Sequence, residues 1–277
     1  MLSKFSGSRQ DLQFVLLLGI LLGVLGISLF LAVSMGSVAI DLEDTYRIIL
    51  SRLGFPLEIG EVSKSTLAIV WNMRFPRVLL GLIVGAGLSM CGSVMQSTVN
   101  NPIAEPYVLG ISAGATLGAT LSIILGLKVV ISLGAFLGAI LATIAVLIIA
   151  SIQGRMTTSS LILSGTVVNA LFLAFSNFII SVGANADSVM TIKFWTMGSL
   201  AGTTWSDLVL PTMVVGIAFL FFSTQYRIFN AMMMGDEAAL TLGIPLRFYW
   251  YLYVTMVALI ALAAVLAGIV CGIIKNV

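Results

Sequence analysis

Long stretches without a charged residue limit what this chain can fold into. There are seven such stretches, and each is long enough for a helix across a hydrocarbon core, which takes about 20 apolar residues. They run between Asp11 and Asp41, Arg77 and Glu105, Glu105 and Lys128, Lys128 and Arg155, Arg155 and Asp187, Asp207 and Arg227, and Arg247 and Lys275. The runs are continuous, whereas the strands of a membrane barrel alternate apolar and polar residues. We therefore predict an all-α fold, a polytopic transmembrane helical bundle with about seven spans.

Composition excludes a cytosolic enzyme. Hydrophobic residues make up 60% of the 277 residues and charged residues 9%, against roughly 25% charged in ordinary soluble domains. The chain has no histidine, so it offers neither an imidazole base nor a histidine metal site. Cys91 and Cys271 lie far apart in apolar runs and form no metal or redox motif. We predict no catalytic residues, no metal, no cofactor and, because there is no basic patch, no nucleic-acid partner.

The predicted spans also lack the groups that usually drive transport. Carboxylates inside a membrane mark proton relays, and the seven spans contain none, although a sodium site of hydroxyls and carbonyls stays open. The chain has no G-x-x-x-x-G-K-[ST] phosphate loop, so it does not hydrolyse ATP by that route. Any energy for transport must then come from another subunit.

Small residues recur at four-residue spacing along several spans. Such stripes let helix backbones approach closely, because lipid supplies no hydrophobic force between helices. We therefore predict close helix packing at Gly19/Gly23, Gly81/Gly85, Gly110/Gly114/Gly118 and Gly134/Gly138.

The segment 226–250, between the last two spans, predicts a short helix. Gly235 interrupts the chain, and Asp236 and Glu237 follow, where acids favour a helix N-terminus. Gly243 suits a C-terminal cap and Pro245 a stop beyond it. We expect a helix of about two turns. This helix either only connects two spans or docks in a partner's groove, and these residues alone favour neither reading.

Two other segments, 41–77 and 100–106, differ from plain spans. Apolar residues at helical spacing predict that the stretch from Asp41 to Leu53 lies along the bilayer surface. The sequence Arg74-Phe75-Pro76-Arg77 precedes the second span, and its arginines either anchor that helix end or bind carboxylates of a soluble partner. Between the second and third spans, a rigid turn is predicted at Asn101, Pro102, Glu105 and Pro106.

Three stretches together resemble a known family. MRFPRVLLGLIVGAGLSMCGSVMQSTVNNPIAEPYVLGISAGATLGA at 73–119 looks like the signature of permeases of iron-siderophore/haem/cobalamin (type II) ABC importers. FWTMGSLAGTTW at 194–205 and MGDEAALTLGIPL at 234–246 match in order and spacing. The resemblance implies a wholly helical subunit, normally of ten spans. It also implies that this chain lacks the last helices, either as a fragment or through a shortened gene.

The resemblance further implies a division of the chain and a set of functional residues. It implies one membrane-spanning domain over 1–277, an extracytoplasmic loop with an interfacial helix over 36–74, and a cytoplasmic coupling region over 229–243. Arg74 and Arg77 would face outside and receive acidic residues of a substrate-binding protein. The residues expected to couple to an ATPase are Met234, Gly235, Asp236, Glu237, Ala239, Leu242 and Gly243.

The function implied by this resemblance is that of a transport subunit rather than an enzyme. We expect a multi-pass permease of the cell (inner) membrane, with a cytoplasmic N-terminus, that imports a ferric siderophore or haem by alternating access. Its expected partners are ABC ATPase subunits, an extracytoplasmic binding protein, a second permease subunit, identical or paralogous, and membrane lipid. The alternatives are an ATPase-independent transporter or channel and a truncated, non-transporting remnant.

Overall fold

A computed structural model describes residues 3–36, 38–56, 62–102, 104–127, 131–152 and 157–273, and every regular element among them is a helix. Five of these helices are long and apolar enough to cross a membrane: Asp11–Ser34, Lys64–Val99, Ile131–Ser151, Ser159–Gly183 and Trp205–Thr224. Two shorter apolar helices cover Ile111–Ile124 and Leu246–Ala261. Each of the seven charge-free stretches overlaps one of these helices, although the second helix begins earlier, at Lys64, so the predicted helical bundle is confirmed.

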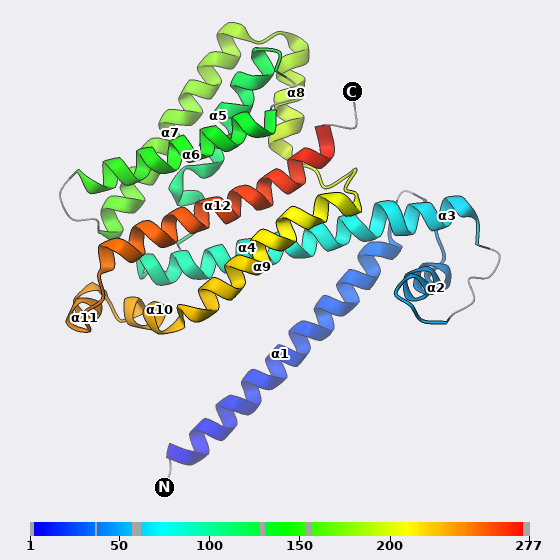
Figure 1. Ribbon diagram of the computed structural model, residues 1–277, viewed down its shortest axis with the longest axis horizontal. Coiled ribbons are helices and arrows are strands. Elements are labelled where there is room, and N and C mark those ends of the chain that lie inside the picture. The colour runs from blue at the N-terminus through cyan, green and yellow to red at the C-terminus, as the bar shows by residue number, and fades with distance from the viewer. Residues whose placement is uncertain are drawn as a thin grey trace. The chain divides into compact units, whose positions relative to one another are not determined.

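The chain divides into two compact units, Met1–Val78 and Leu79–Val277. The first contains α1 (Ser3–Ser34), α2 (Leu42–Arg52), α3 (Lys64–Ala68), η1 (Ile69–Arg74) and the start of α4 (Phe75–Val99). The second contains the rest of α4, η2 (Pro106–Leu109), α5 (Ile111–Ile124), α6 (Ile131–Ser151), α7 (Thr158–Gly183), α8 (Ala186–Met197), α9 (Trp205–Thr224), α10 (Tyr226–Met233), α11 (Asp236–Thr241) and α12 (Leu246–Ile273). Figure 1 labels these elements along the chain.

In the first unit, α2 has two different apolar faces. Ile48 is fully buried and packs in a small cluster with Val33 of α1 and Val70 of η1. Leu42 and Tyr46 lie on another face and are about half exposed. The helix predicted between Asp41 and Leu53 is therefore confirmed, while its contact with the bilayer stays a prediction.

A π-helical turn connects α3 to α4. The turn, η1, ends one residue before Phe75 and two residues before Pro76. Proline donates no backbone hydrogen bond, and inside an α-helix its ring collides with the carbonyl four residues earlier. Because a π-turn widens the helix locally, it accommodates Pro76 without ending the helix.

In the second unit, α5 and α6 pack with their backbones in direct contact. A methyl group built on Gly114 would lie 2.4 Å from the carbonyl oxygen of Gly138, and one on Gly118 would lie 2.0 Å from that of Gly134. These two predicted stripes are confirmed as packing surfaces. Gly19, Gly23 and Gly85 have nothing within 4 Å of such a methyl group, so no described residue packs closely there.

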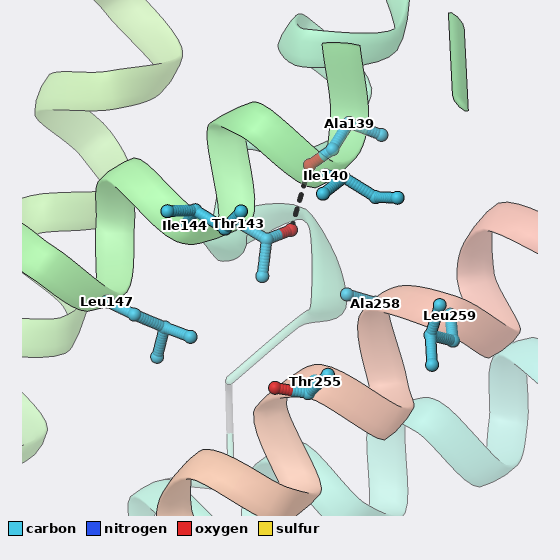
Figure 2. Close-up of a pocket in the computed structure, with 8 residues that line it drawn as sticks. All are labelled: Ala139, Ile140, Thr143, Ile144, Leu147, Thr255, Ala258 and Leu259. Atoms are coloured by element: carbon cyan, nitrogen blue, oxygen red, sulfur yellow. Dashed lines mark hydrogen bonds between the residues drawn. The ribbon is translucent and has the colours of Figure 1, made fainter. Parts of the chain in front are cut away.

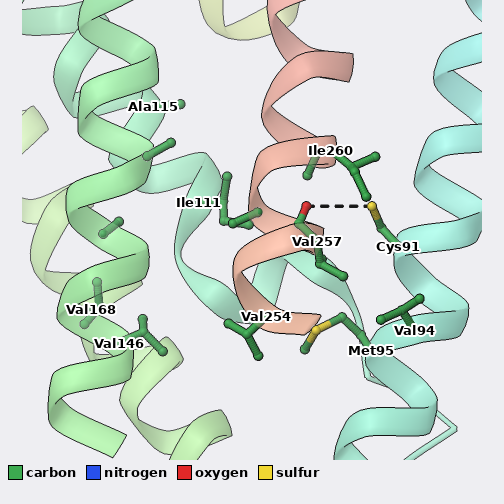
Figure 3. Close-up of a cluster of buried hydrophobic side chains, with 14 of the residues drawn as sticks. Cys91, Val94, Met95, Ile111, Ala115, Val146, Val168, Val254, Val257 and Ile260 are labelled. Atoms are coloured by element: carbon green, nitrogen blue, oxygen red, sulfur yellow. Dashed lines mark hydrogen bonds between the residues drawn. The ribbon is translucent and has the colours of Figure 1, made fainter. Parts of the chain in front are cut away.

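Helix α12 runs through the core of the second unit. Figure 3 shows it between α4 on one side and the α5–α7 helices on the other. Buried Val254, Val257 and Ile260 face the neighbouring helices, and the Cys91 thiol donates to the carbonyl oxygen of Val257 at 3.7 Å. Cys91 is thus a buried thiol that fills the core, while the side chain of Cys271 lies outside the described residues.

The close approach of α5 and α6 predicts which glycine substitution destabilises the protein. Gly118→Ala forces the two backbones apart and should lower the free energy of unfolding by about 1–3 kcal/mol. Gly92→Ala in α4 is the control, because a methyl group there meets nothing within 4 Å. Thermal unfolding in the same detergent measures both. Equal stability of the two variants would contradict the described α5–α6 contact.

Candidate functional site

The segment between the last two spans folds as a pair of short helices, α10 and α11. Gly235 separates them with φ +103°, a backbone conformation that favours glycine. At the other end, Gly243 has φ +77°, and its N–H donates to the carbonyl oxygen of Leu240 at 3.0 Å. The N–H of Ile244 donates to that of Ala239 at 3.1 Å, which completes a Schellman cap. The predicted start and stop are confirmed, although α11 is six residues long and therefore shorter than two turns.

Burial divides the residues of this pair into two sets. Met232 and Ala239 are buried, so they hold the pair against the rest of the unit. The exposed residues include Met233, Met234, Asp236, Glu237, Leu240 and Leu242, and we call this set the coupling surface after the role that the resemblance implies for the segment. Met232, Met233 and Met234 do not share one face, as expected for consecutive positions in a helix.

A buried aromatic cluster attaches α10 to α9 and α12. The ring of Phe229 lies 4.7 Å from that of Tyr253, centroid to centroid, and the ring of Phe222 lies 6.0 Å from Tyr253. The Tyr253 hydroxyl donates to Oε1 of Gln225, the residue between α9 and α10, at 3.2 Å. Sequence reasoning missed this cluster, because its members lie up to 31 positions apart in the chain.

The turn that follows α4 lies beside the α10–α11 pair. Asn100 adopts φ +48°, Pro106 begins η2, and the N–H of Asn101 donates to the carbonyl oxygen of Gln96. A methyl group on Gly235 would lie 3.9 Å from Nδ2 of Asn100. Asn100, which directly precedes the rigid turn predicted at Asn101, Pro102, Glu105 and Pro106, thus lies near Gly235, and residue 103 lies outside the described residues.

In the first unit, the two arginines of Arg74-Phe75-Pro76-Arg77 have different surroundings. Nη1 of Arg74 donates to the carbonyl oxygens of Val33 at 3.2 Å and Ser34 at 2.7 Å, and Nη2 donates to that of Val38. Arg77 is exposed. The structure therefore gives Arg74 a role inside the chain, whereas docking of a partner at either arginine stays a prediction.

A small cavity lies between α6 and α12 (Figure 2). Its volume is about 220 Å³, below the roughly 300–1,000 Å³ of most ligand pockets. Six of its eight lining residues are apolar, and the two hydroxyls belong to Thr143 and Thr255. The Thr143 hydroxyl donates to the carbonyl oxygen of Ala139 at 2.9 Å. Over the described ranges there is also no group of three or more metal-ligating His, Cys, Asp or Glu residues.

The fold and this site define a polytopic helical membrane protein with a short helix pair between its last two described spans. The sequence model that describes the FecCD transport family matches residues 21–275 of this chain. The chain belongs to the FecCD transport family.

Individual relatives agree with this assignment. The chain is 32% identical to the uncharacterized ABC transporter permease protein YvrB of Bacillus subtilis, over 80% of this chain and 64% of YvrB. It is 36% identical to the cobalamin import system permease protein BtuC of Halobacterium salinarum, over 76% of this chain and 57% of the relative. It is 30% identical to the ferric enterobactin transport system permease protein FepG of Escherichia coli, over 77% of this chain and 65% of FepG. The chain thus spans less than two thirds of each of these relatives.

A solved structure shares the fold. A chain of a metal-chelate type ABC transporter in an inward-facing conformation superposes with a TM-score of 0.71 at 21% identity, over 90% of this chain and 73% of that chain.

The Tyr253–Gln225 hydrogen bond predicts a measurable contribution to stability. Tyr253→Phe keeps the ring contacts and removes the hydroxyl, so the free energy of unfolding should fall by about 1 kcal/mol. Tyr251→Phe is the control, because Tyr251 is exposed on the same helix. Denaturant titration in mixed micelles compares them. If the two variants unfold alike, the hydrogen bond does not hold the α9–α10 junction to α12.

Proposed function

We propose that this chain is the membrane-spanning permease subunit of an ATP-driven importer that takes up an iron chelate, a ferric siderophore or haem, by alternating access. The observation that carries the proposal is the coupling surface. It places exposed apolar and acidic side chains on a short helix pair whose other face is buried in the span bundle. Membership of the FecCD transport family supports a transport subunit, and FepG, one of the relatives, is named for ferric enterobactin, whereas BtuC is named for cobalamin.

The proposed partner at the coupling surface is an ABC ATPase subunit on the cytoplasmic side. Exposed Met234, Leu240 and Leu242 offer apolar anchors of the kind that fill a groove in a partner. Asp236 and Glu237 lie in the first turn of α11, where they are available to cations of that partner. The N-terminus would then be cytoplasmic, and the chain would be a multi-pass protein of the cell membrane.

Movement of the ATPase would reach the spans through the aromatic cluster. Phe229 on α10 contacts Tyr253 on α12, and Phe222 on α9 contacts the same ring. A displacement of α10 therefore acts on two span helices at once, because packed interiors transmit strain. The substrate would pass along α4, α5 and α7 and between this chain and a second permease subunit, identical or paralogous. An extracytoplasmic binding protein would deliver it.

Reversing the charge of the coupling surface tests this proposal. Asp236→Lys with Glu237→Lys should remove the ATPase subunit from the complex purified gently from its own membrane. It should also reduce uptake of iron chelate at least tenfold, because a like-charge contact at an interface costs several kcal/mol. Native mass spectrometry and uptake of radioactive iron measure the two effects.

The matched control is Glu43→Lys with Asp44→Lys, which reverses the acidic pair in the first turn of α2. Both double variants lose a favourable interaction with a helix N-terminus, and the α2 variant also loses the Glu43–Arg47 ion pair, so a general loss of helix stability would affect the control at least as strongly. Unchanged uptake in the α11 variant would favour an ATPase-independent transporter or channel. Recovery of the unaltered chain without any ATPase and without uptake would indicate a non-transporting remnant.

A further inference from the structure

We propose that α2 binds phospholipid through one of its faces, which is inserted into the membrane interface at the end of α1. This face consists of Leu42, Tyr46 and Leu53, and we call it the apolar stripe of α2. The inference goes beyond the proposed function, because it needs only the helical membrane fold and contacts within Met1–Val78.

The other two faces of α2 already have an environment. On the buried face, Ile48 is fully enclosed and packs with Val33 of α1 and Val70 of η1, so this face holds α2 to the rest of the unit. On the polar face, Glu43 and Arg47 form an ion pair at 2.6 Å, and both side chains are exposed, as expected for a surface in contact with water. Only the third face is both apolar and uncovered.

That third face, the apolar stripe, has no covering residue in its own unit. Its members are spaced by four and seven positions, which brings them to one side of a helix with 3.6 residues per turn. Leu42 is 53% exposed, Tyr46 51% and Leu53 57%. Large apolar side chains gathered on one exposed face mark a contact with a membrane or with another protein.

The position of the stripe relative to α1 identifies lipid as the partner. Asp11–Ser34 of α1 is long and apolar enough to cross a membrane, and none of its most apolar window is buried. The ring of Phe30, about one turn before the end of this span, meets that of Tyr46 edge to face at 6.1 Å between centroids. The stripe therefore begins at the depth where the span leaves the hydrocarbon.

The direction of α2 agrees with this depth. Figure 1 shows α2 almost end-on and α1 from the side, so α2 lies across the end of α1. A helix that lies across the end of a span runs along the membrane surface, where one apolar face enters the lipid and the opposite polar face stays in water.

The chemistry of α2 fits an uncharged lipid surface. Tyr46 combines an apolar ring with a polar hydroxyl, the combination that enriches tyrosine at membrane interfaces. The two acids, Glu43 and Asp44, balance the two bases, Arg47 and Arg52, and Arg52 also lies over the ring of Trp71. Burial of apolar side chains, rather than attraction to anionic headgroups, then drives the contact, so phosphatidylcholine suffices.

Spin labels distinguish lipid from water and from protein at this surface. Leu42→Cys and Leu53→Cys are labelled one at a time in the full chain, with Cys271→Ser in the background and buried Cys91 left in place. Glu43→Cys, on the polar face, is the matched control. In phosphatidylcholine nanodiscs, collisions with oxygen report hydrocarbon and collisions with a nickel chelate report water. The oxygen-to-nickel ratio at positions 42 and 53 should be roughly tenfold that at position 43.

Three results would overturn the proposal. Equal ratios at the three positions would place the stripe in water. Low collision rates with both reagents at positions 42 and 53 would show that protein covers it, whether the second unit, a second copy or a soluble partner. A raised ratio that appears only after phosphatidylglycerol is added would show that charge, not apolar burial, drives the contact.

A photoreactive phosphatidylcholine tests the unaltered chain, so this result does not depend on the folding of a variant. With a diazirine near the glycerol backbone of the lipid, mass spectrometry should find roughly tenfold more adducts at Tyr46 than at Glu43. Equal labelling of the two residues would contradict insertion of the stripe. Neither measurement involves uptake or an ATPase, so failure here is distinguishable from failure of the proposed function.

Discussion

Lipid offers no hydrogen bonds, so every backbone group of this chain within the membrane must find a partner in the protein. The described elements are accordingly all helices, and their hydroxyl side chains donate back to carbonyls of the preceding turn. Ser89, Ser93 and Ser97 on α4 do this in succession, each to the carbonyl four residues earlier. The same requirement applies most strongly at helix ends, because the last carbonyls of a helix have no partner within that helix.

The chain satisfies its helix ends in two different ways. At α11 the solution is local, since Gly243 allows the chain to turn back and its neighbours' N–H groups supply the donors. At α1 the solution is remote, since Arg74 supplies the donors from η1. A local cap ends α11 with donors from the residues that follow it directly. A remote cap instead joins two segments, and movement of either one changes the other.

Features with a local cause could be predicted from the sequence. The spans follow from charge-free runs between residues such as Asp207 and Arg227, and the ends of α11 follow from Gly235 and Gly243. The remaining features depend on residues that are distant in sequence. Nothing near Tyr253 indicates that Gln225 accepts its hydroxyl, and nothing near Arg74 indicates that α1 ends beside it. The sequence pattern of Arg74 and Arg77 is nearly symmetric, so only their different surroundings distinguish them.

Close backbone packing would let the proposed coupling surface act on distant parts of the second unit. Helices α5 and α6 meet at Gly114, Gly118, Gly134 and Gly138, where neither backbone has room to yield. Helix α12 in turn packs against α6 and α9 and carries Tyr253. A force applied at Phe229 therefore meets a stiff array rather than a set of independent helices. The small cavity between α6 and α12 is one place in this array where side chains leave free volume, and a second cavity lies between α4 and α9, so neighbouring side chains lose some packing contacts at both.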